Sequence, residues 1–183
     1  PASVGLPMPG TEIRIIDPDE NGVGEIICKG DSVMIGYYDN PEETAKVLVD
    51  GWLHTGDYGY FDEDGFLYIT GRKKNVIVTK NGKNIFPEEV EFYLNKSDYI
   101  AEVLVWGLED EKTGDTIVQA EIFPDFPALE EKFGRVPEEE ELRRILKKEI
   151  DRINEQMPLY KRVKRFEIRR EEFEKTTTRK IKR

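Results

Sequence analysis

The sequence has little of what zinc sites, disulfide scaffolds and membrane helices require. It contains one cysteine, Cys28, and one histidine, His54, among 183 residues. An internal disulfide and a Cys/His zinc site are therefore excluded, and we predict no metal site. No apolar run approaches the ~20 residues of a transmembrane segment. The start, PASVGLPMPG, has neither an initiator Met nor a signal-peptide pattern, so we expect part of a longer, cytoplasmic protein.

Positive charge is scarce except near the end of the sequence. The chain holds 28 Lys/Arg and 38 Asp/Glu, a net charge of -10, which argues against a general nucleic-acid binder. Residues 161–183 nevertheless carry 11 Lys/Arg and 4 Asp/Glu, whereas residues 1–160 carry 17 and 34. This basic tail has three interpretations: a disordered solvated end, a phosphate-contact strip, or a loop that presents a catalytic lysine.

Short strands separated by turn residues fill the first seventy residues. Asp-Pro, Asn-Gly and Asp-Gly pairs mark the turns. We expect strands over residues 12–16, 24–29 and 65–70, and a short helix over 41–49 with Asn40 as its N-cap. This pattern predicts a β-rich subdomain with a small, barrel-like sheet.

Strands alternate with helices after Arg72. The expected elements are a hairpin over 76–86, a helix over 87–95, strands over 102–106 and 117–123, a loop over 124–137, a helix over 138–156 and a strand over 163–168. The helix at 138–156 has one apolar stripe, formed by Leu142, Ile145, Leu146, Ile150 and Ile153. The second region is therefore predicted to be an α+β domain with a mostly antiparallel sheet and flanking helices.

Three polar residues have side chains suited to ligand binding or catalysis. The local sequence alone does not decide between such a role and a structural one. Asp57, in GWLHTGD, offers a carboxylate that can accept both hydrogens of a vicinal diol, although a Thr-Gly-Asp triplet on its own favours a plain turn. Arg72 offers a planar fork of donors for phosphate or sugar oxygens, or else is a solvated cation. His54 has no neighbouring Cys or Ser nucleophile and is interpreted as a packing or hydrogen-bonding residue.

The order of five segments carries more information than any single residue. The series GYYDNPEETA, GWLHTGD, DEDGFLYITGRKKNVI, NGKNIFPEEVE and KTTTRKIKR, over residues 36–183, resembles the adenylate-forming (AMP-binding) enzymes, and most closely the long-chain fatty acyl-CoA synthetases. The resemblance implies a β-rich third subdomain over 1–71, a hinge at 72–75 and a small carboxy-terminal domain over 76–183. It also implies acyl adenylation by ATP, followed by thioester formation with coenzyme A.

The resemblance assigns roles to five residues. Asp57 matches the carboxylate that binds the ATP ribose, and Arg72 matches its helper on the ribose and phosphate side. Lys74 matches the hinge residue, Gly82 the loop that lines the coenzyme A channel, and Lys180 the catalytic lysine. This chain has Glu174 and Arg179 where the family usually has Pro and Gly, so we expect a stiffer loop around Lys180.

Two family segments have no counterpart in this sequence. There is no Ser/Thr/Gly-rich phosphate loop followed by Lys, and no Tyr-Gly-x-Thr-Glu segment of the kind that holds adenine and supports magnesium. We therefore expect the Mg²⁺ ligands, the acyl pocket and most of the active site to lie in a missing amino-terminal domain, the main partner of this chain. The isolated chain is predicted to be inactive.

Two alternatives remain open at this point. An acyl-adenylating ligase can deliver its product to a carrier protein instead of coenzyme A. A non-catalytic binding module can use the basic tail to contact RNA or anionic lipid. Peripheral contact with a membrane surface also stays open beside the cytoplasmic location.

Overall fold

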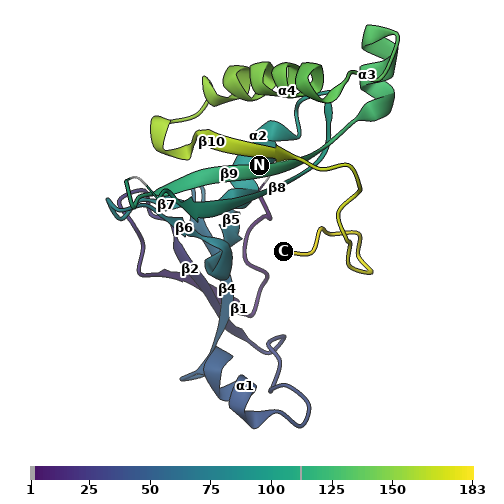
Figure 1. Ribbon diagram of the computed structural model, residues 1–183. Helices are drawn as coiled ribbons and strands as arrows, with labels where there is room; N and C mark the ends of the chain where they lie inside the picture. Colours follow the sequence, from purple (N-terminus) through teal and green to yellow (C-terminus); the bar gives the residue numbers. More distant parts are fainter. Residues whose placement is uncertain (1–2, 112) are drawn as a thin grey trace. The chain divides into compact units, whose positions relative to one another are not determined.

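The computed structural model describes residues 3–111 and 113–183 and contains two compact units. The first ends at Asn75, and the second is Val76–Arg183. A curled antiparallel sheet forms the first unit, and an α+β arrangement forms the second (Figure 1). The predicted fold class is therefore confirmed.

Antiparallel pairing builds the whole sheet of the first unit. Its strands follow the order β1-β2-β4-β3, and β5 also pairs with β4. The Asn40 side chain caps the only α-helix described in this unit by accepting the Glu43 N–H at 3.1 Å, as predicted. The elements are β1 (Thr11–Ile16), β2 (Gly24–Gly30), α1 (Pro41–Val47), β3 (Leu48–Val49), β4 (Trp52–Phe61), β5 (Leu67–Arg72) and the 3-10 helix η1 (Lys73–Asn75).

Strand β4 is the main difference from the predicted first unit. The turn that the Thr-Gly-Asp triplet favours is not formed, because all three residues belong to this ten-residue strand. β4 pairs with β2, β3 and β5, and these long-range pairings override the low strand preference of Gly and Asp. The strand predicted at 65–70 begins later, at Leu67, because Asp62 and Gly65 close a turn before it.

A mixed sheet and three α-helices form the main body of the second unit as described. β8 pairs antiparallel with β9, and β10 pairs parallel with β9. A parallel return needs a long crossover, which α3 and α4 supply between β9 and β10 (Figure 1). The elements are β6 (Ile77–Val78), β7 (Asn84–Ile85), α2 (Pro87–Leu94), β8 (Ile100–Glu109), β9 (Thr116–Pro124), α3 (Phe126–Phe133), α4 (Glu139–Asn154), the 3-10 helix η2 (Leu159–Lys161) and β10 (Val163–Ile168).

Helix α3 overturns the predicted loop over 124–137. The Asp125 side chain caps its start by accepting the Ala128 N–H at 3.0 Å, and Gly134 ends it in the left-handed conformation, with φ at 73°. Pro127 is compatible with the first turn because the N–H groups there have no partner within the helix. Leu129, fully buried, then fixes α3 on the core.

The apolar stripe of α4 packs on the sheet as predicted. Leu142 and Leu146 are completely buried, Ile150 and Ile153 nearly so, and Ile145 packs at the edge. Each fully buried side chain of this kind contributes about 1.5–3 kcal/mol relative to an exposed one. The core around this stripe includes Ile77, Ile85, Val90, Leu94, Ile100, Val103, Val105, Val118, Ala120, Ile122, Leu129, Met157 and Val163.

Candidate active site

A cross-strand ion pair brings two of the predicted site residues together. Asp57 on β4 lies opposite Arg72 on β5, and Asp57 Oδ1 is 3.0 Å from Arg72 Nε. The side chains are 28% and 53% exposed, respectively. The pair is therefore fixed by the sheet and still accessible to a ligand.

A bulge in β4 sets the position of Asp57. Between the pairs Ile27–His54 and Glu25–Tyr58, strand β2 has one residue and β4 has three. Thr55 locks this bulge, because its Oγ1 donates to the Ile26 carbonyl at 2.7 Å and accepts the Asp57 N–H at 3.1 Å. Bulges of this kind re-aim side chains at functional sites.

Glycine is required at one point of this bulge. Gly56 has φ at 67°, in the region that side-chain-bearing residues rarely adopt. The Cβ of any other residue there would lie 4.0 Å from the Arg72 guanidinium. Backbone conformation, rather than space, therefore explains glycine beside Asp57.

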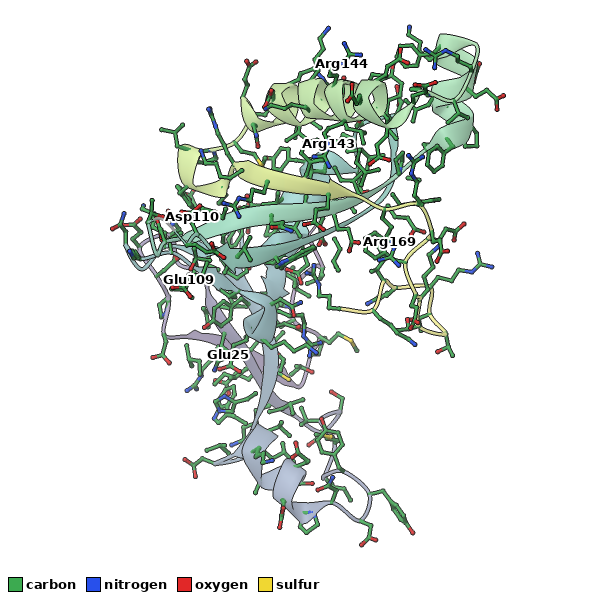
Figure 2. The ribbon with its side chains drawn as sticks, viewed as in Figure 1. Glu25, Glu109, Asp110, Arg143, Arg144 and Arg169 are labelled. Atoms are coloured by element: carbon green, nitrogen blue, oxygen red, sulfur yellow. The ribbon has the colours of Figure 1, made fainter. Side chains whose placement is uncertain are left out.

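A buried carboxylate that sequence reasoning missed lies in the same sheet. Glu25 on β2 (Figure 2) is 7% exposed in its side chain, and its Oε2 is 2.7 Å from Lys73 Nζ and 3.5 Å from His54 Nδ1. Burial raises the pKa of Glu25, but the hydrogen bonds and charges of Lys73 and His54 outweigh it and hold the pKa below its ordinary value. His54 thus contacts a carboxylate, which agrees with the packing or hydrogen-bonding role predicted for it.

The predicted hinge residue follows this cluster directly. Lys74 is exposed and belongs to η1, which begins at the Lys73 that pairs with Glu25. The ion pair anchors the first residue of η1 to β2. Nothing in the structure tests rotation at Lys74, so its hinge role stays a prediction.

Gly82 lies in the tight turn between β6 and β7. Its N–H donates to the Thr79 carbonyl at 2.9 Å, and the Thr79 N–H donates to the Lys83 carbonyl at 3.0 Å. Its φ is 72°, and no atom lies within 4 Å of the position that a Cβ would take. The turn therefore requires glycine for its backbone conformation.

Lys180 is exposed on a small hairpin formed by residues 174–182, here called the tail hairpin. Lys175 and Ile181 form an antiparallel bridge, and the Thr176 N–H donates to the Lys180 carbonyl at 2.8 Å. The Lys180 N–H in turn donates to Thr176 Oγ1 at 3.2 Å. Within residues 3–111 and 113–183, no carboxylate forms an ion pair with Lys180, and no hydrogen bond joins it to Gly82.

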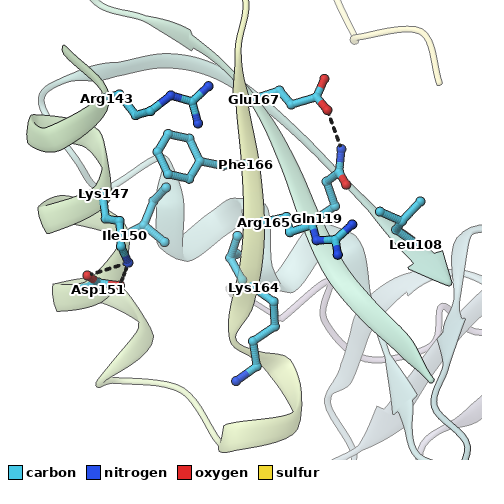
Figure 3. A pocket seen from close by; sticks show the side chains of 11 residues that line it. Leu108, Gln119, Arg143, Lys147, Ile150, Asp151, Lys164, Arg165, Phe166 and Glu167 are labelled. Carbon is cyan, nitrogen blue, oxygen red and sulfur yellow. Dashed lines mark hydrogen bonds and ion pairs between the residues drawn. The ribbon is translucent and has the colours of Figure 1, made fainter. Parts of the chain in front are cut away.

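A charged groove between α4 and β10 is lined by none of these residues. Its cavity volume is about 570 Å³ (Figure 3). Arg143 lies over the Phe166 ring at 5.3 Å, and the Lys147 ammonium contacts both carboxylate oxygens of Asp151 at 3.0 Å. Lys147–Asp151 is the one ion pair between lining residues of the groove as described, and Gln119 donates to Glu167 at 3.3 Å. We assign this groove no part in the candidate site.

The described residues contain neither a candidate metal cluster nor a candidate membrane-spanning helix. No group of three His, Cys, Asp or Glu there is placed to hold a metal ion, so we assign no residue of this chain to magnesium. No helix among them has the length and apolar character needed to span a membrane.

Comparison with known proteins identifies the family. A family model described as the AMP-binding enzyme C-terminal domain matches residues 74–183. The chain therefore belongs to the AMP-binding enzyme family, and the resemblance inferred from its motifs is confirmed. A long-chain-fatty-acid–CoA ligase from Bacillus subtilis is 47% identical over 123 residues, which cover 64% of this chain and 22% of the relative.

Solved structures of adenylate-forming enzymes resemble the chain over nearly its full length. The o-succinylbenzoate CoA synthetase of Bacillus subtilis, in complex with its acyl-adenylate intermediate, has a TM-score of 0.77 and 30% identity, over 98% of this chain and 34% of that one. An amide bond synthetase from Marinactinospora thermotolerans has a TM-score of 0.66 and 31% identity, over 92% of this chain and 32% of that one.

The relatives are longer than this chain and differ in the compounds that their names describe. The chain spans about a fifth of the length of the curated relatives and about a third of the solved ones. The chain therefore belongs to the adenylate-forming ligase family, whose members named here differ in the acid and in the acceptor.

Proposed function

We propose that this chain is the carboxy-terminal part of a cytoplasmic, ATP-dependent fatty acyl-CoA synthetase. The enzyme would join a long-chain fatty acid to AMP and then transfer the acyl group to coenzyme A. The similarity to a long-chain-fatty-acid–CoA ligase over 64% of the chain supports this substrate class. The remaining active-site groups, including the magnesium ligands, would come from the amino-terminal domain of the parent enzyme.

The observation that carries the proposal is the ion pair between Asp57 and Arg72. The two carboxylate oxygens of Asp57 suit the vicinal hydroxyls of a ribose, and Arg72 contacts Asp57 through Nε, which leaves its terminal nitrogens to donate to sugar or phosphate oxygens. A β-bulge and a cross-strand register hold both side chains before ATP arrives. Such preorganisation reduces the entropy lost on binding.

Lys180 would act in the first half-reaction. A carboxylate oxygen of the fatty acid attacks the α-phosphorus of ATP, and pyrophosphate leaves. The Lys180 ammonium offsets the negative charge that accumulates on the phosphoryl oxygens in the transition state. Bound magnesium, present with ATP in one solved relative, would neutralise further phosphate charge.

Gly82 would serve the second half-reaction. The thiol sulfur of coenzyme A attacks the acyl carbon of the adenylate, AMP leaves, and the thiol proton passes to a base or to solvent. The turn between β6 and β7 would line the channel of the thiol arm. Rotation at Lys74 would exchange Lys180 for this turn between the two steps.

The decisive experiment uses the full-length parent enzyme with ATP, a long-chain fatty acid and free coenzyme A. We expect acyl-CoA, AMP and pyrophosphate. Adenylate without acyl-CoA would favour delivery to a carrier protein, and no adenylate from any acid would refute the proposal. Lys180→Ala should slow adenylation by about 100-fold or more and largely spare thioester formation from preformed acyl adenylate.

A binding module based on the basic tail is the weaker alternative. Lys175 pairs with Glu102, and Arg183 pairs with Glu91, so two of the tail cations already have protein partners. Salt-sensitive binding of RNA or anionic vesicles, lost on deletion of residues 173–183, would nevertheless support it.

A further inference from the structure

The first leg of the tail hairpin is attached to β8. The Phe173 N–H donates to Glu102 Oε2 at 2.9 Å, and the Lys175 ammonium pairs with the other oxygen of the same carboxylate. Phe173 is 6% exposed, and the guanidinium of Arg169 (labelled in Figure 2) lies over the Phe173 ring, 4.5 Å from the ring centroid. The chain is therefore fixed where it enters the hairpin.

Arg183 attaches the other leg to α2 and β8. Its Nη2 lies 2.7 and 2.8 Å from the two carboxylate oxygens of Glu91, and its Nη1 donates to the Val105 carbonyl at 2.8 Å. Glu91 also accepts the Val105 N–H at 2.7 Å, and Glu88 is 3.7 Å from the guanidinium. The side chains of Glu91 and Arg183 are 15% and 26% exposed, respectively, so the pair is largely enclosed.

Between the two attachments, the two legs of the tail hairpin pair with each other as a short antiparallel ladder. The Lys182 N–H donates to the Glu174 carbonyl at 2.9 Å, and the bridge between Lys175 and Ile181 follows. Lys180 begins the return leg, three residues before Arg183. Figure 1 shows this segment leaving β10 and folding back on itself.

We propose that Arg183 and Glu91 are positioning residues for Lys180, which hold the return leg of the tail hairpin so that the lysine is already ordered before adenylation. This inference rests on the proposed function of Lys180. Arg183 suits this task because its planar fork binds a carboxylate and a carbonyl at once, which a lysine does not reproduce.

Arg183 offsets part of the cost of burying the Glu91 carboxylate. Burial raises the pKa of Glu91 to about 7, although the charge of Arg183 and the Val105 N–H act to lower it. Loss of Arg183 would therefore favour the neutral form of Glu91. The attachment would then lack both the guanidinium of residue 183 and the negative charge of residue 91. The freed residues would gain conformational freedom, which adenylation must then remove again.

The test compares half-reactions in the full-length parent enzyme. Arg183→Gln should lower kcat for adenylation by about 10- to 100-fold, change KM for ATP little, and leave thioester formation from preformed acyl adenylate within about twofold. Glu91→Gln should act in the same direction, and Arg183→Lys should restore only part of the rate. Lys182→Gln is the matched control, because Lys182 pairs with the exposed Glu174, and it should leave adenylation unchanged.

Two further measurements separate positioning from loss of fold and from failure of the proposed function. In Lys180→Ala enzyme, adding Arg183→Gln should slow adenylation no further, and a second additive loss would overturn the inference. Trypsin should cleave the tail of Arg183→Gln faster than that of wild type, and equal cleavage would also overturn it. Normal adenylation by Lys180→Ala would refute the proposed role of Lys180, whereas a defect in that variant with normal Arg183→Gln would refute positioning alone.

Discussion

Among the residues that the structure describes, Glu25 is the one buried residue with a charged side chain. Lys73→Met removes the cation that pairs with it. Breaking a fully buried ion pair by removing one partner costs about 3–5 kcal/mol. Lys73 is 55% exposed, so water screens the interaction and the expected cost is smaller. We expect Lys73→Met to lower the free energy of unfolding of the first unit by about 1–3 kcal/mol at pH 7.

Glu25→Gln should cost less than Lys73→Met, about 0.5–1.5 kcal/mol. The amide keeps the shape of the carboxylate, and the Lys73 ammonium can return to water. Lys73→Met instead leaves a buried charge with His54 as its remaining partner. Comparing the loss of unfolding free energy in Lys73→Met with that in Glu25→Gln therefore tests whether Glu25, rather than Lys73, is the group whose charge is costly to bury.

The pH dependence of this pair follows from the lowered pKa of Glu25. Its pKa in the folded chain lies below the ordinary value of 4.5, so folding favours the ionised form. The stabilisation is fully present above pH 4.5 and is lost as the pH falls through the folded pKa. The difference in free energy of unfolding between wild type and Glu25→Gln should therefore become smaller below pH 4.5.

The two tryptophans allow each unit to be measured separately. Trp52 lies on β4 in the first unit, and Trp106 lies on β8 in the second. Urea titration of Trp52 fluorescence in a Trp106→Phe background reports the first unit. Lys46→Met, which breaks an exposed pair with Glu43, is the control and should cost less than about 0.5 kcal/mol. A larger cost for Glu25→Gln than for Lys73→Met would refute the reasoning.

Three other outcomes are expected. Leu146→Ala, at a completely buried position of α4, should destabilise the second unit by about 2–5 kcal/mol, measured by Trp106 fluorescence in a Trp52→Phe background. Because the pKa of Glu91 is raised from 4.5 to about 7, the free energy of unfolding of the second unit should fall by on the order of 3 kcal/mol as the pH rises through this range. Glu91→Gln should abolish this fall when the same titration is repeated. Asp57→Asn in the parent enzyme should weaken ATP-dependent adenylation by about 10- to 100-fold, because charged hydrogen bonds contribute about 1.5–3 kcal/mol, and an unchanged rate of pyrophosphate release would contradict the ribose assignment.

Local signals predicted the elements whose boundaries are encoded nearby. The cap at Asn40 and the apolar stripe of α4 lie within single segments, so spacing alone reveals them. Strand β4 depends on pairing with three other strands, and α3 depends on a cap at Asp125 that precedes a proline. Both segments contain residues typical of turns, Gly56 and Asp57 in β4 and Pro127 in α3. Strand pairing overrides this preference in β4, and the Asp125 cap does so in α3.

The candidate site shows the same limit. Motif order predicted Asp57 and Arg72 as site residues, but their contact follows from a long-range register that the sequence does not display. Glu91 carried an unused signal: it lies four residues after Pro87 and three before Leu94, both of which are buried, so it falls on the inner face of α2. An acidic residue on an apolar stripe indicates a buried cationic partner, here Arg183.

Arg179 links the departure from the family sequence to the order of the tail hairpin. It has φ at 60°, the left-handed conformation that glycine adopts freely and that costs other residues about 1–2 kcal/mol. The Arg179 N–H donates to the Thr176 carbonyl at 2.9 Å, which closes the turn around this strained residue. A strained backbone conformation persists only where surrounding contacts hold it in place. Here the attachments of the two hairpin legs to Glu102 and Glu91 provide those contacts. The same attachments that would order Lys180 therefore also allow an arginine where the family has glycine.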